Sequence, residues 1–586
     1  MKLIKNMEEI LNNLMFSIRR FPLVVLSSSL TTLILIFIVN NDAVLADSTL
    51  DILKKTAMTA ALGFPLFLII KLVFERFEGF KKEYRYLSYF TVIIFLITYY
   101  FLFIEDFRTV SMSRFTVLNI SFYLIVLLVH YFYKRDKFEL YTAEILSRFF
   151  VSAVYAAVLF VGLTAILFTV DKLFELSLAG EVYITAWLTA AGIFAPIHLL
   201  AGLPKFEDEF TAEDFSSFLR VLLFYIVMPL IAVYTIILYL YFVKIMLAGE
   251  WPQNLLGHLV LWYSLITLAV IFLIKPFQKS SRWARTFIFW LPKVIILPLI
   301  MMFSALWIRI SEYGITENRY YVALAGCWVF AVMLYYSFSR EKRNTLLILS
   351  LAVITLLSVF GPWSSFAVSI NSQNMRFEDI LRENEMLVEG KIIKRDEIPS
   401  REVRKEISAV IRYFDRNHSL NDLKYLPDDF KVEDMESVFG FKYQYYYSGQ
   451  VRYFYHEPAE LIKAVDVGEY DLFIELNYGS NQGKIYTKDY NDFKLEFSAD
   501  DMEIKIFRLE KLLFDRSLKD KLAELHRLLE TKDQSSLNEG EYSYHYEDEK
   551  IKLQILFRNF SGRVYDSQPG RMELQRLNSF VFIKFK

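Results

Sequence analysis

Apolar residues change their spacing along this chain near residue 362. Before that point they gather in runs of 18–23 residues, and after it they recur in short pieces with helical or alternating spacing. Because about 20 residues of α-helix cross the hydrocarbon core of a bilayer, the runs predict membrane-spanning helices. We expect eleven spans, at residues 21–39, 56–74, 87–104, 115–133, 149–170, 182–202, 221–243, 255–274, 286–308, 320–337 and 345–362.

Residues 1–20 form a separate element before the first span. Their apolar side chains repeat at helical spacing from Leu3 to Ile18, and Arg19 and Arg20 follow. This pattern predicts an amphipathic helix that lies in the bilayer interface. The apolar stretch 21–39 is longer than the usual core of an export signal, so we expect it to remain as the first span rather than to be removed by cleavage after Ala46.

Residues 363–586 carry the patterns of a folded domain outside the bilayer, following a transmembrane helical domain at 21–362. Helical spacing covers 372–390, 400–418 and 517–530. Alternation predicts a hairpin within 441–457 and strands at 470–478, 502–509, 541–547, 550–558 and 579–585. We therefore expect a soluble α+β domain with an antiparallel or mixed sheet.

Lys and Arg in the connecting segments predict the direction in which the chain crosses the bilayer. With the N-terminus in the cytoplasm, the inner segments carry 21 basic residues and the outer segments carry 8. Cytoplasmic loops are enriched in Lys and Arg, so this orientation is favoured. An odd number of spans then places residues 363–586 outside the cytoplasm.

Charge and cysteine content narrow the classes of function. The net charge is +6 before residue 363 and −7 after it, and a weakly acidic outer domain has no electrostatic reason to bind nucleic acid. Cys327 is the single cysteine, which excludes an internal disulfide and a metal site built from several thiolates. The seven histidines lack metal-binding spacing, so we expect no metal and no cofactor.

A glycine-containing segment, GSNQGKI at 479–485, has some features of a phosphate-binding loop. It has three residues between its glycines where four are needed, and Ile485 stands where a hydroxyl would bind Mg²⁺. We interpret it as a hairpin turn. No other familiar catalytic motif is present, which favours a non-enzymatic protein.

Three polar side chains within or beside the spans are candidate binding residues, because charges inside a bilayer are costly and often functional. Lys293 is the strongest, since it lies between Pro292 and Pro298, and prolines leave backbone carbonyls without their helical donors. The alternative is that the Lys293 side chain extends back to the inner surface. His198 and Lys244 are weaker candidates.

The turn RISEYGITENRYY at 309–321 is predicted to lie on the outer side of the membrane. One interpretation is a well-capped turn, because Gly314 suits the end of one helix and Thr316 suits the start of the next. The second is a docking surface for the acidic outer domain. The residues that would carry this docking are Arg309, Glu312, Tyr313 and Arg319.

Six phrases of the sequence form a recognisable series. They are RRFPL at 19–23, VLFVGLTAILFTVDKLFEL at 158–176, PIHLLAGLP at 196–204, VMPLIAVYTIILYLYFVKI at 227–245, RISEYGITENRYY at 309–321 and GPWSSFAVSINSQNMRFEDIL at 361–381. In this order they resemble an uncharacterised family of bacterial multi-span membrane proteins, known as domain of unknown function 4153. The resemblance implies a bacterial cytoplasmic-membrane protein. It implies no activity, cofactor or catalytic residue.

Three classes of function remain open. We favour a binding, sensing or scaffold protein whose partners are the lipid bilayer and a ligand of the cell envelope, and whose outer domain rests on the helical core. Lys293 and the prolines around it favour a small-molecule transporter instead. A lipid-linked glycosyl transferase is the third class, since Asp42, Asp47 and Asp51 fall in the first outer loop. The sequence does not indicate an oligomeric state.

Overall fold

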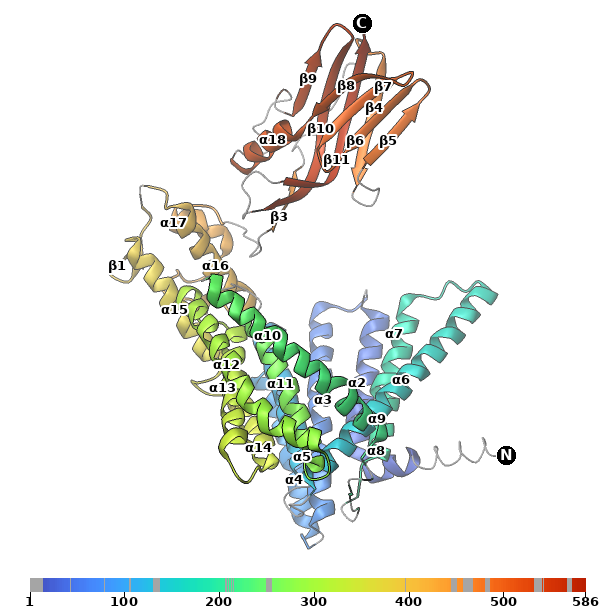
Figure 1. The fold of residues 1–586 in the computed structure, drawn as a ribbon, viewed down its shortest axis with the longest axis vertical. Helices are drawn as coiled ribbons and strands as arrows, with labels where there is room; N and C mark the ends of the chain where they lie inside the picture. Colours follow the sequence, from blue (N-terminus) through green and yellow to red (C-terminus); the bar gives the residue numbers. More distant parts are fainter. Residues whose placement is uncertain are drawn as a thin grey trace. The chain divides into compact units, whose positions relative to one another are not determined.

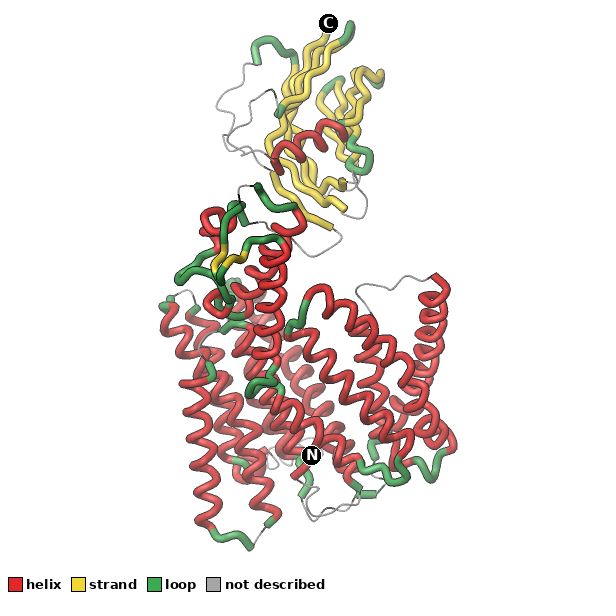
Figure 2. The backbone as a smooth tube through the Cα atoms, turned by 90° about the vertical axis from the view of Figure 1, so that its left-hand side faces the viewer, coloured by secondary structure: helices red, strands yellow, loops and turns green. Residues whose placement is uncertain are grey.

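The computed structural model describes the chain except residues 1–13, 43, 78, 105–106, 130–136, 206–207, 209, 212, 214, 249–255, 396, 444–450, 457–466, 480–484, 532–539, 541 and 566–571. The chain forms two compact units, Met1–Tyr443 and Gln444–Lys586. Helices dominate the first and strands the second, as Figure 2 shows by colour.

The helices of the first unit, labelled in Figure 1, follow the apolar runs of the sequence. They are α2 Pro22–Asn41, α3 Asp47–Arg76, α4 Lys82–Leu102, α5 Thr109–Val129, α6 Phe138–Phe174, α7 Gly180–Thr189, η1 Ala190–Phe194, α8 Ala195–Ala201, α9 Ser217–Val221, η2 Leu222–Val227, α10 Met228–Ala248, α11 Leu256–Ile274, η3 Lys275–Phe277, α12 Arg282–Tyr313, α13 Glu317–Phe338 and α14 Asn344–Leu357. Within the described residues, 10 helices are long and apolar enough to cross a membrane. The prediction of a multi-span helical domain is therefore confirmed.

The eleventh expected span, 345–362, is a shorter helix than the sequence suggested. α14 has 14 residues, which is about 21 Å of helix at 1.5 Å per residue. α14 nevertheless runs antiparallel to α13 and brings the chain back to the level at which α13 starts. Asn344 contacts Tyr336, Ser350 accepts a bond from Trp328, and Ser365 bonds Tyr321 just after α14 ends. α14 and the turn behind it therefore complete one antiparallel passage beside α13.

The amphipathic helix expected at 1–20 falls mostly outside the described residues. Residues 14–20 are helical, and Phe21 interrupts the helix before Pro22 opens α2. Phe21 itself is fully buried, in a cluster with side chains of α3, α5 and α8. The structure therefore describes only the last residues of this expected helix.

Two spans contain a π-helical turn followed by a proline. η1 ends two residues before Pro196, and η2 ends two residues before Pro229. Proline has no backbone N–H and its ring crowds the preceding turn, so the helix widens there instead of keeping regular bonds. Single π-helical turns of this kind are common at functional sites.

A second helical layer follows α14 in the same unit. Its elements are α15 Ser365–Glu383, β1 Leu387–Val388, β2 Lys391–Ile392, α16 Arg401–Asn417, η4 Leu420–Asp422, η5 Val432–Asp434 and α17 Met435–Phe439. Side chains of α15, α16 and α17, including Phe377, Phe414 and Phe439, form a core of their own. The helix expected at 372–390 begins earlier than predicted, because Ser364 caps it by accepting a bond from the Ala367 N–H.

The division of the chain lies elsewhere than the expected domain boundary at 362. Residues 363–443 belong to the same compact unit as the membrane helices. Phe366 shows why, since it is buried with Tyr99 of α4, Leu118 of α5 and Val359. The segment following the last span therefore packs on the helices before the chain reaches the second unit.

The described residues of the second unit form two antiparallel sheets and one helix. The elements are β3 Val451–His456, β4 Leu472–Gly479, β5 Ile485–Tyr490, β6 Phe493–Ser498, β7 Glu503–Arg508, β8 Lys511–Ser517, α18 Lys519–Thr531, β9 Ser543–Glu547, β10 Ile551–Tyr565 and β11 Met572–Phe585. One sheet has the order β3-β10-β11-β4 with β9 also paired to β10, and the other has the order β5-β6-β7-β8. The expected α+β domain is confirmed in this unit.

Both sheets contribute to one core. Leu476 of β4 and Ile555 of β10 are buried in the same cluster as Phe497 of β6 and Ile504 of β7. α18 adds its apolar face, and the leucines that recur at helical spacing in this segment are buried, namely Leu518 just before the helix and Leu522, Leu525 and Leu529 within it. Alternation along strands and helical spacing along α18 thus direct apolar side chains to one interior.

The two hairpin turns expected in this unit have different outcomes. β4 and β5 belong to different sheets, so the segment 479–485 connects two sheets and is not a hairpin turn between paired strands. The turn of the hairpin expected within 441–457 lies among residues 444–450, outside the described part, and β3 pairs with β10.

Candidate functional site

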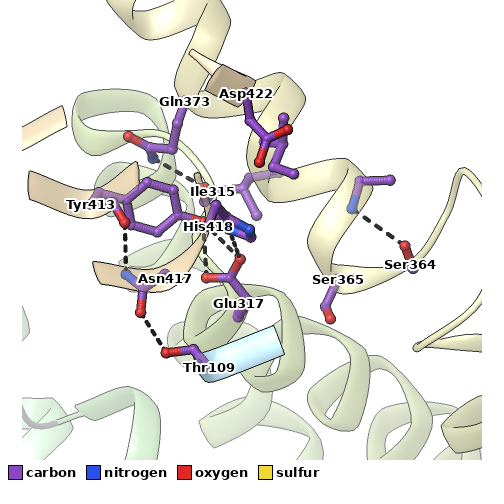
Figure 3. A network of polar contacts seen from close by, with 12 residues as sticks. Thr109, Ile315, Glu317, Ser364, Ser365, Gln373, Tyr413, Asn417, His418 and Asp422 are labelled. Atoms are coloured by element: carbon purple, nitrogen blue, oxygen red, sulfur yellow. Dashed lines mark hydrogen bonds and ion pairs between the residues drawn. The ribbon is translucent and has the colours of Figure 1, made fainter. Parts of the chain in front are cut away.

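A buried group of polar side chains joins the start of α13 to the end of α16. We call Glu317, Tyr413 and His418 the junction triad (Figure 3). The Tyr413 hydroxyl donates to the Glu317 carboxylate, with O–O distances of 2.7 Å and 2.9 Å, and His418 Nε2 lies 2.7 Å from Glu317 Oε1. A carboxylate accepts but does not donate, so Nε2 carries the proton in this contact.

Burial makes the junction triad energetically important. The Glu317 side chain is 10% exposed and that of His418 is 2% exposed. Glu317 is also the first residue of α13, where the positive end of the helix dipole favours a negative charge. Burial, followed by the charge of Glu317, raises the pKa of the Tyr413 hydroxyl far above its usual range. Tyr413 therefore stays protonated and remains a donor.

A second set of bonds holds α15 to the turn between α12 and α13. The Ile315 N–H donates to Ser372 Oγ at 2.8 Å, and Gln373 Nε2 donates to the carbonyls of Tyr313 and Ile315 at 2.9 Å and 3.0 Å. The last carbonyls of a helix have no partners within it. Gln373 supplies donors to this helix end from a different part of the chain.

The start of α5 joins the same site. The Thr109 hydroxyl donates to Asn417 Oδ1 at 2.9 Å, and the Arg108 guanidinium donates to the His418 carbonyl. The connectors before α5 and before α13 were both predicted to lie on the outer side of the membrane. Both contact the end of α16, so these two helix ends lie on the same side of the helical region.

The four candidate residues of the 309–321 turn differ in their contacts and in their exposure. Arg319 donates to the carbonyls of Tyr313 and Gly314 at 3.1 Å and 2.6 Å, which closes the end of α12. The guanidinium groups of Arg319 and Arg376 each lie 5.6 Å from the centre of the Tyr313 ring. Arg309 is half-buried near Arg319, and Glu312 is exposed. A binding role for these four residues stays a prediction.

The docking hypothesis named Arg309, Glu312, Tyr313 and Arg319. The hydrogen bonds from α15 and α16 instead reach Glu317 and the backbone of the turn, and of the four named side chains Tyr313 lies beside Arg376 of α15. Arg319 bonds carbonyls of its own turn, and the buried charge that α16 meets is Glu317. A carboxylate at the expected start of a helix is a weak signal for Glu317. Nothing in the sequence linked it to Tyr413 or His418, which follow 96 and 101 residues later.

The Lys293 side chain turns back along α12 toward the start of the helix, as the alternative interpretation of this residue expected. Its ammonium lies 3.3 Å from the centre of the Phe289 ring, one turn earlier on α12, and 5.6 Å from that of Trp290. Lysine side chains near a bilayer surface extend in this way toward the interface.

His198 and Lys244 lie away from the junction triad. His198 Nδ1 is 2.8 Å from the Ser152 hydroxyl, which donates its own proton to the Arg148 carbonyl. A hydroxyl has one proton, so His198 is the donor to Ser152 and does not activate it as a base. Lys244 is exposed on α10. The structure does not bring these candidates together.

The second unit holds a buried pair of imidazoles that the sequence analysis did not single out. His456 Nε2 of β3 lies 2.8 Å from His526 Nδ1 of α18, and both residues are buried beside the rings of Phe454 and Phe560. Burial, and then the charge of His526, lowers the pKa of His456 to about 4. His456 is therefore neutral in the folded unit at pH 7.

We expect acid to weaken the second unit through this pair. An unfolded His has a pKa of about 6.5, so between pH 6.5 and about 4 the unfolded chain binds a proton that folded His456 excludes. The free energy of unfolding is therefore unaffected by this group above pH 6.5 and decreases as the pH falls from 6.5 toward about 4. Amide-exchange protection of β3 and β10 in the full chain should fall between pH 7 and pH 5. A His456→Phe, His526→Phe variant should lose less, and equal losses would contradict the assignment.

Among the described residues, no group of three or more His, Cys, Asp or Glu side chains is placed to hold a metal ion.

Comparisons with known proteins place the helical region in a family. The family model described as domain of unknown function (DUF4153) matches residues 18–382. The chain is 23% identical over 260 residues to the Uncharacterized protein PM1469 of Pasteurella multocida (strain Pm70), a match that covers 44% of this chain and 44% of that relative. No solved structure matches. Since the family model spans more than half of the sequence, the chain belongs to the DUF4153 family of multi-span membrane proteins.

Proposed function

We propose that this protein is a non-enzymatic binding or sensing protein of the bacterial cytoplasmic membrane. In this proposal the second unit binds a ligand of the cell envelope, and residues 365–443 relay its state to the membrane helices. The observation that carries the proposal is the buried contact of Glu317 with Tyr413 and His418. It ties a membrane helix directly to the segment that leads to the second unit.

The physical argument rests on how such a contact responds to movement. A buried carboxylate that loses its donors costs several kcal/mol, so α16 and the start of α13 are expected to move together. Gln373 and Ser372 add bonds between α15 and the same turn. A force on this segment would therefore reach α13 and, through Gly314, the long helix α12.

The proposal includes an orientation, with the second unit outside the cytoplasm. The charge bias of the connectors supports it, with 21 basic residues on the inner side and 8 on the outer side. A phosphatase that is active only after export, fused behind Lys586, should be active. A fused reporter that works only in the cytoplasm would overturn this orientation.

The test of the function compares the full chain with a chain that ends at Tyr443. In a strain that lacks the gene and grows poorly under envelope stress, the full chain should restore growth. The shortened chain keeps the whole first unit, so it should reach the membrane in equal amounts but restore no growth. Full restoration by the shortened chain would show that the second unit is not the receptor.

A small-molecule transporter is the second candidate, supported by the two π-helical turns. Pro196 and Pro229 each follow such a turn inside a span, and backbone carbonyls freed in this way can line a path for a solute. In the same strain, a transporter would keep its activity in the chain that ends at Tyr443. It would lose activity on Pro196→Ala or Pro229→Ala.

A further inference from the structure

Lys275 and Lys342 meet at the end of α13 opposite the junction triad, and Lys293 lies close enough for its charge to act on Lys342. We call Lys275, Lys293 and Lys342 the lysine cluster. Lys275 opens η3, Lys293 lies on α12, and Lys342 lies in the connector between α13 and α14. Lys275 Nζ donates to the Lys342 carbonyl and lies 2.8 Å from Glu139 Oε1.

Glu139 is the carboxylate that contacts this cluster, and its position is fixed. The same oxygen that Lys275 contacts also accepts a bond from Asn344 Nδ2 at 2.8 Å, and Asn344 in turn contacts the Tyr336 hydroxyl. The acid of the nearby connector, Glu341, is exposed and pairs with Arg343 at 2.9 Å. Among the described residues, the direct carboxylate contact of this cluster is therefore that of Lys275 with Glu139.

The remaining positive charges act on one another. Burial first, and then the charges of Lys293 and Lys275, lower the pKa of Lys342. The Lys342 ammonium lies over the Tyr336 ring, 5.5 Å from its centre, which attracts a cation but does not neutralise it. An anion near these ammonium groups would remove this repulsion.

The surroundings of Lys293 indicate where that anion would come from. The two rings beside its ammonium, Phe289 and Trp290, are 53% and 57% exposed on α12. Exposed aromatic rings beside a lysine are typical of the headgroup level of a bilayer, and a lysine such as Lys293, the twelfth residue of α12, reaches that level by extending its side chain along the helix. Lys293 thus faces the lipid, whereas Lys275 and Lys342 approach the same region from the connectors.

We propose that the lysine cluster binds the phosphate of an anionic phospholipid, with the lipid chains lying along the exposed apolar face of α12. Basic pockets between transmembrane helices suit such headgroups. The proposal concerns the end of the helices that the charge bias assigns to the cytoplasm. It does not depend on what the second unit binds.

The experiment measures lipid binding by the full chain. The protein is purified in a neutral detergent at low ionic strength, and binding of phosphatidylglycerol and of phosphatidylcholine is measured by native mass spectrometry. Phosphatidylglycerol should bind more tightly than phosphatidylcholine. The double variant Lys293→Gln, Lys342→Gln should weaken phosphatidylglycerol binding about 30-fold, since each lysine near the surface is worth about 1 kcal/mol.

Two controls make the result decisive. Lys279→Gln removes an exposed lysine from the same connector as Lys275 and should change binding less than twofold. Inorganic phosphate at 10 mM, which lacks lipid chains, should displace little phosphatidylglycerol. Equal binding of both lipids, an unchanged affinity in the double variant, or full displacement by inorganic phosphate would overturn the proposal, the last by pointing to a soluble anion.

Discussion

Replacing Glu317 with Ala should loosen the contact between α16 and the membrane helices more than any other single side-chain truncation at this site. The change removes the acceptor of the Tyr413 hydroxyl and of His418 Nε2. Both donors then lose this buried acceptor, and a buried polar group without its partner costs about 1–3 kcal/mol. Amide exchange along α16 should accelerate, and thermal unfolding of the first unit should begin earlier.

The matched control is Glu312→Ala, five residues earlier on the same turn. Glu312 is exposed, and removing an exposed charge changes stability by about 1 kcal/mol or less. Glu317→Gln should fall between the two, because its amide oxygen still accepts one bond. If Glu317→Ala and Glu312→Ala gave the same exchange rates in α16, the junction triad would not hold the segment in place.

Replacing Gly314 with Ala should disrupt the same region by straining the backbone of the turn between α12 and α13. Gly314 ends α12 with φ 67° and ψ 179°, a region that is open almost only to glycine. A Cβ there would also lie 2.8 Å from Gln373 Nε2 and 3.2 Å from Ser372 Oγ. The strain and the displaced bonds together should cost about 2–4 kcal/mol. Increased protease cleavage within residues 365–443 would report it.

Gly162→Ala is the control for this change. Gly162 lies inside α6, and a Cβ there meets no atom within 4 Å, so alanine should be neutral or stabilise the helix by about 0.5–1 kcal/mol. Equal cleavage rates for Gly314→Ala and the natural chain would show that the turn tolerates a side chain. The positive φ at Gly314 would then not be required for the contact with α15.

The amino-acid sequence by itself determined the elements whose signal is local. Runs of about 20 apolar residues give a helix that must satisfy its own backbone in lipid, so α2 to α13 appear where the runs are. The faces of α16 and α18 were readable for a similar reason, because helical spacing collects Ile407 and Phe414, or Leu518 and Leu525, on one side. These are short-range properties that do not depend on partners.

Only the tertiary structure shows which elements pair or pack with one another. The sequence did not show that β4 and β5 enter different sheets, since alternation marks a strand but not its neighbour. It suggested that the region after residue 362 rests on the helical core, but not that residues 363–443 form one compact unit with the helices, because that depends on the packing of Phe366 with Tyr99 and Leu118. Glu317 was visible as a helix-starting acid, but its role depends on His418, 101 residues away. A buried charge is stabilised only by partners that the folded chain brings to it, so the junction triad exists only in the tertiary structure.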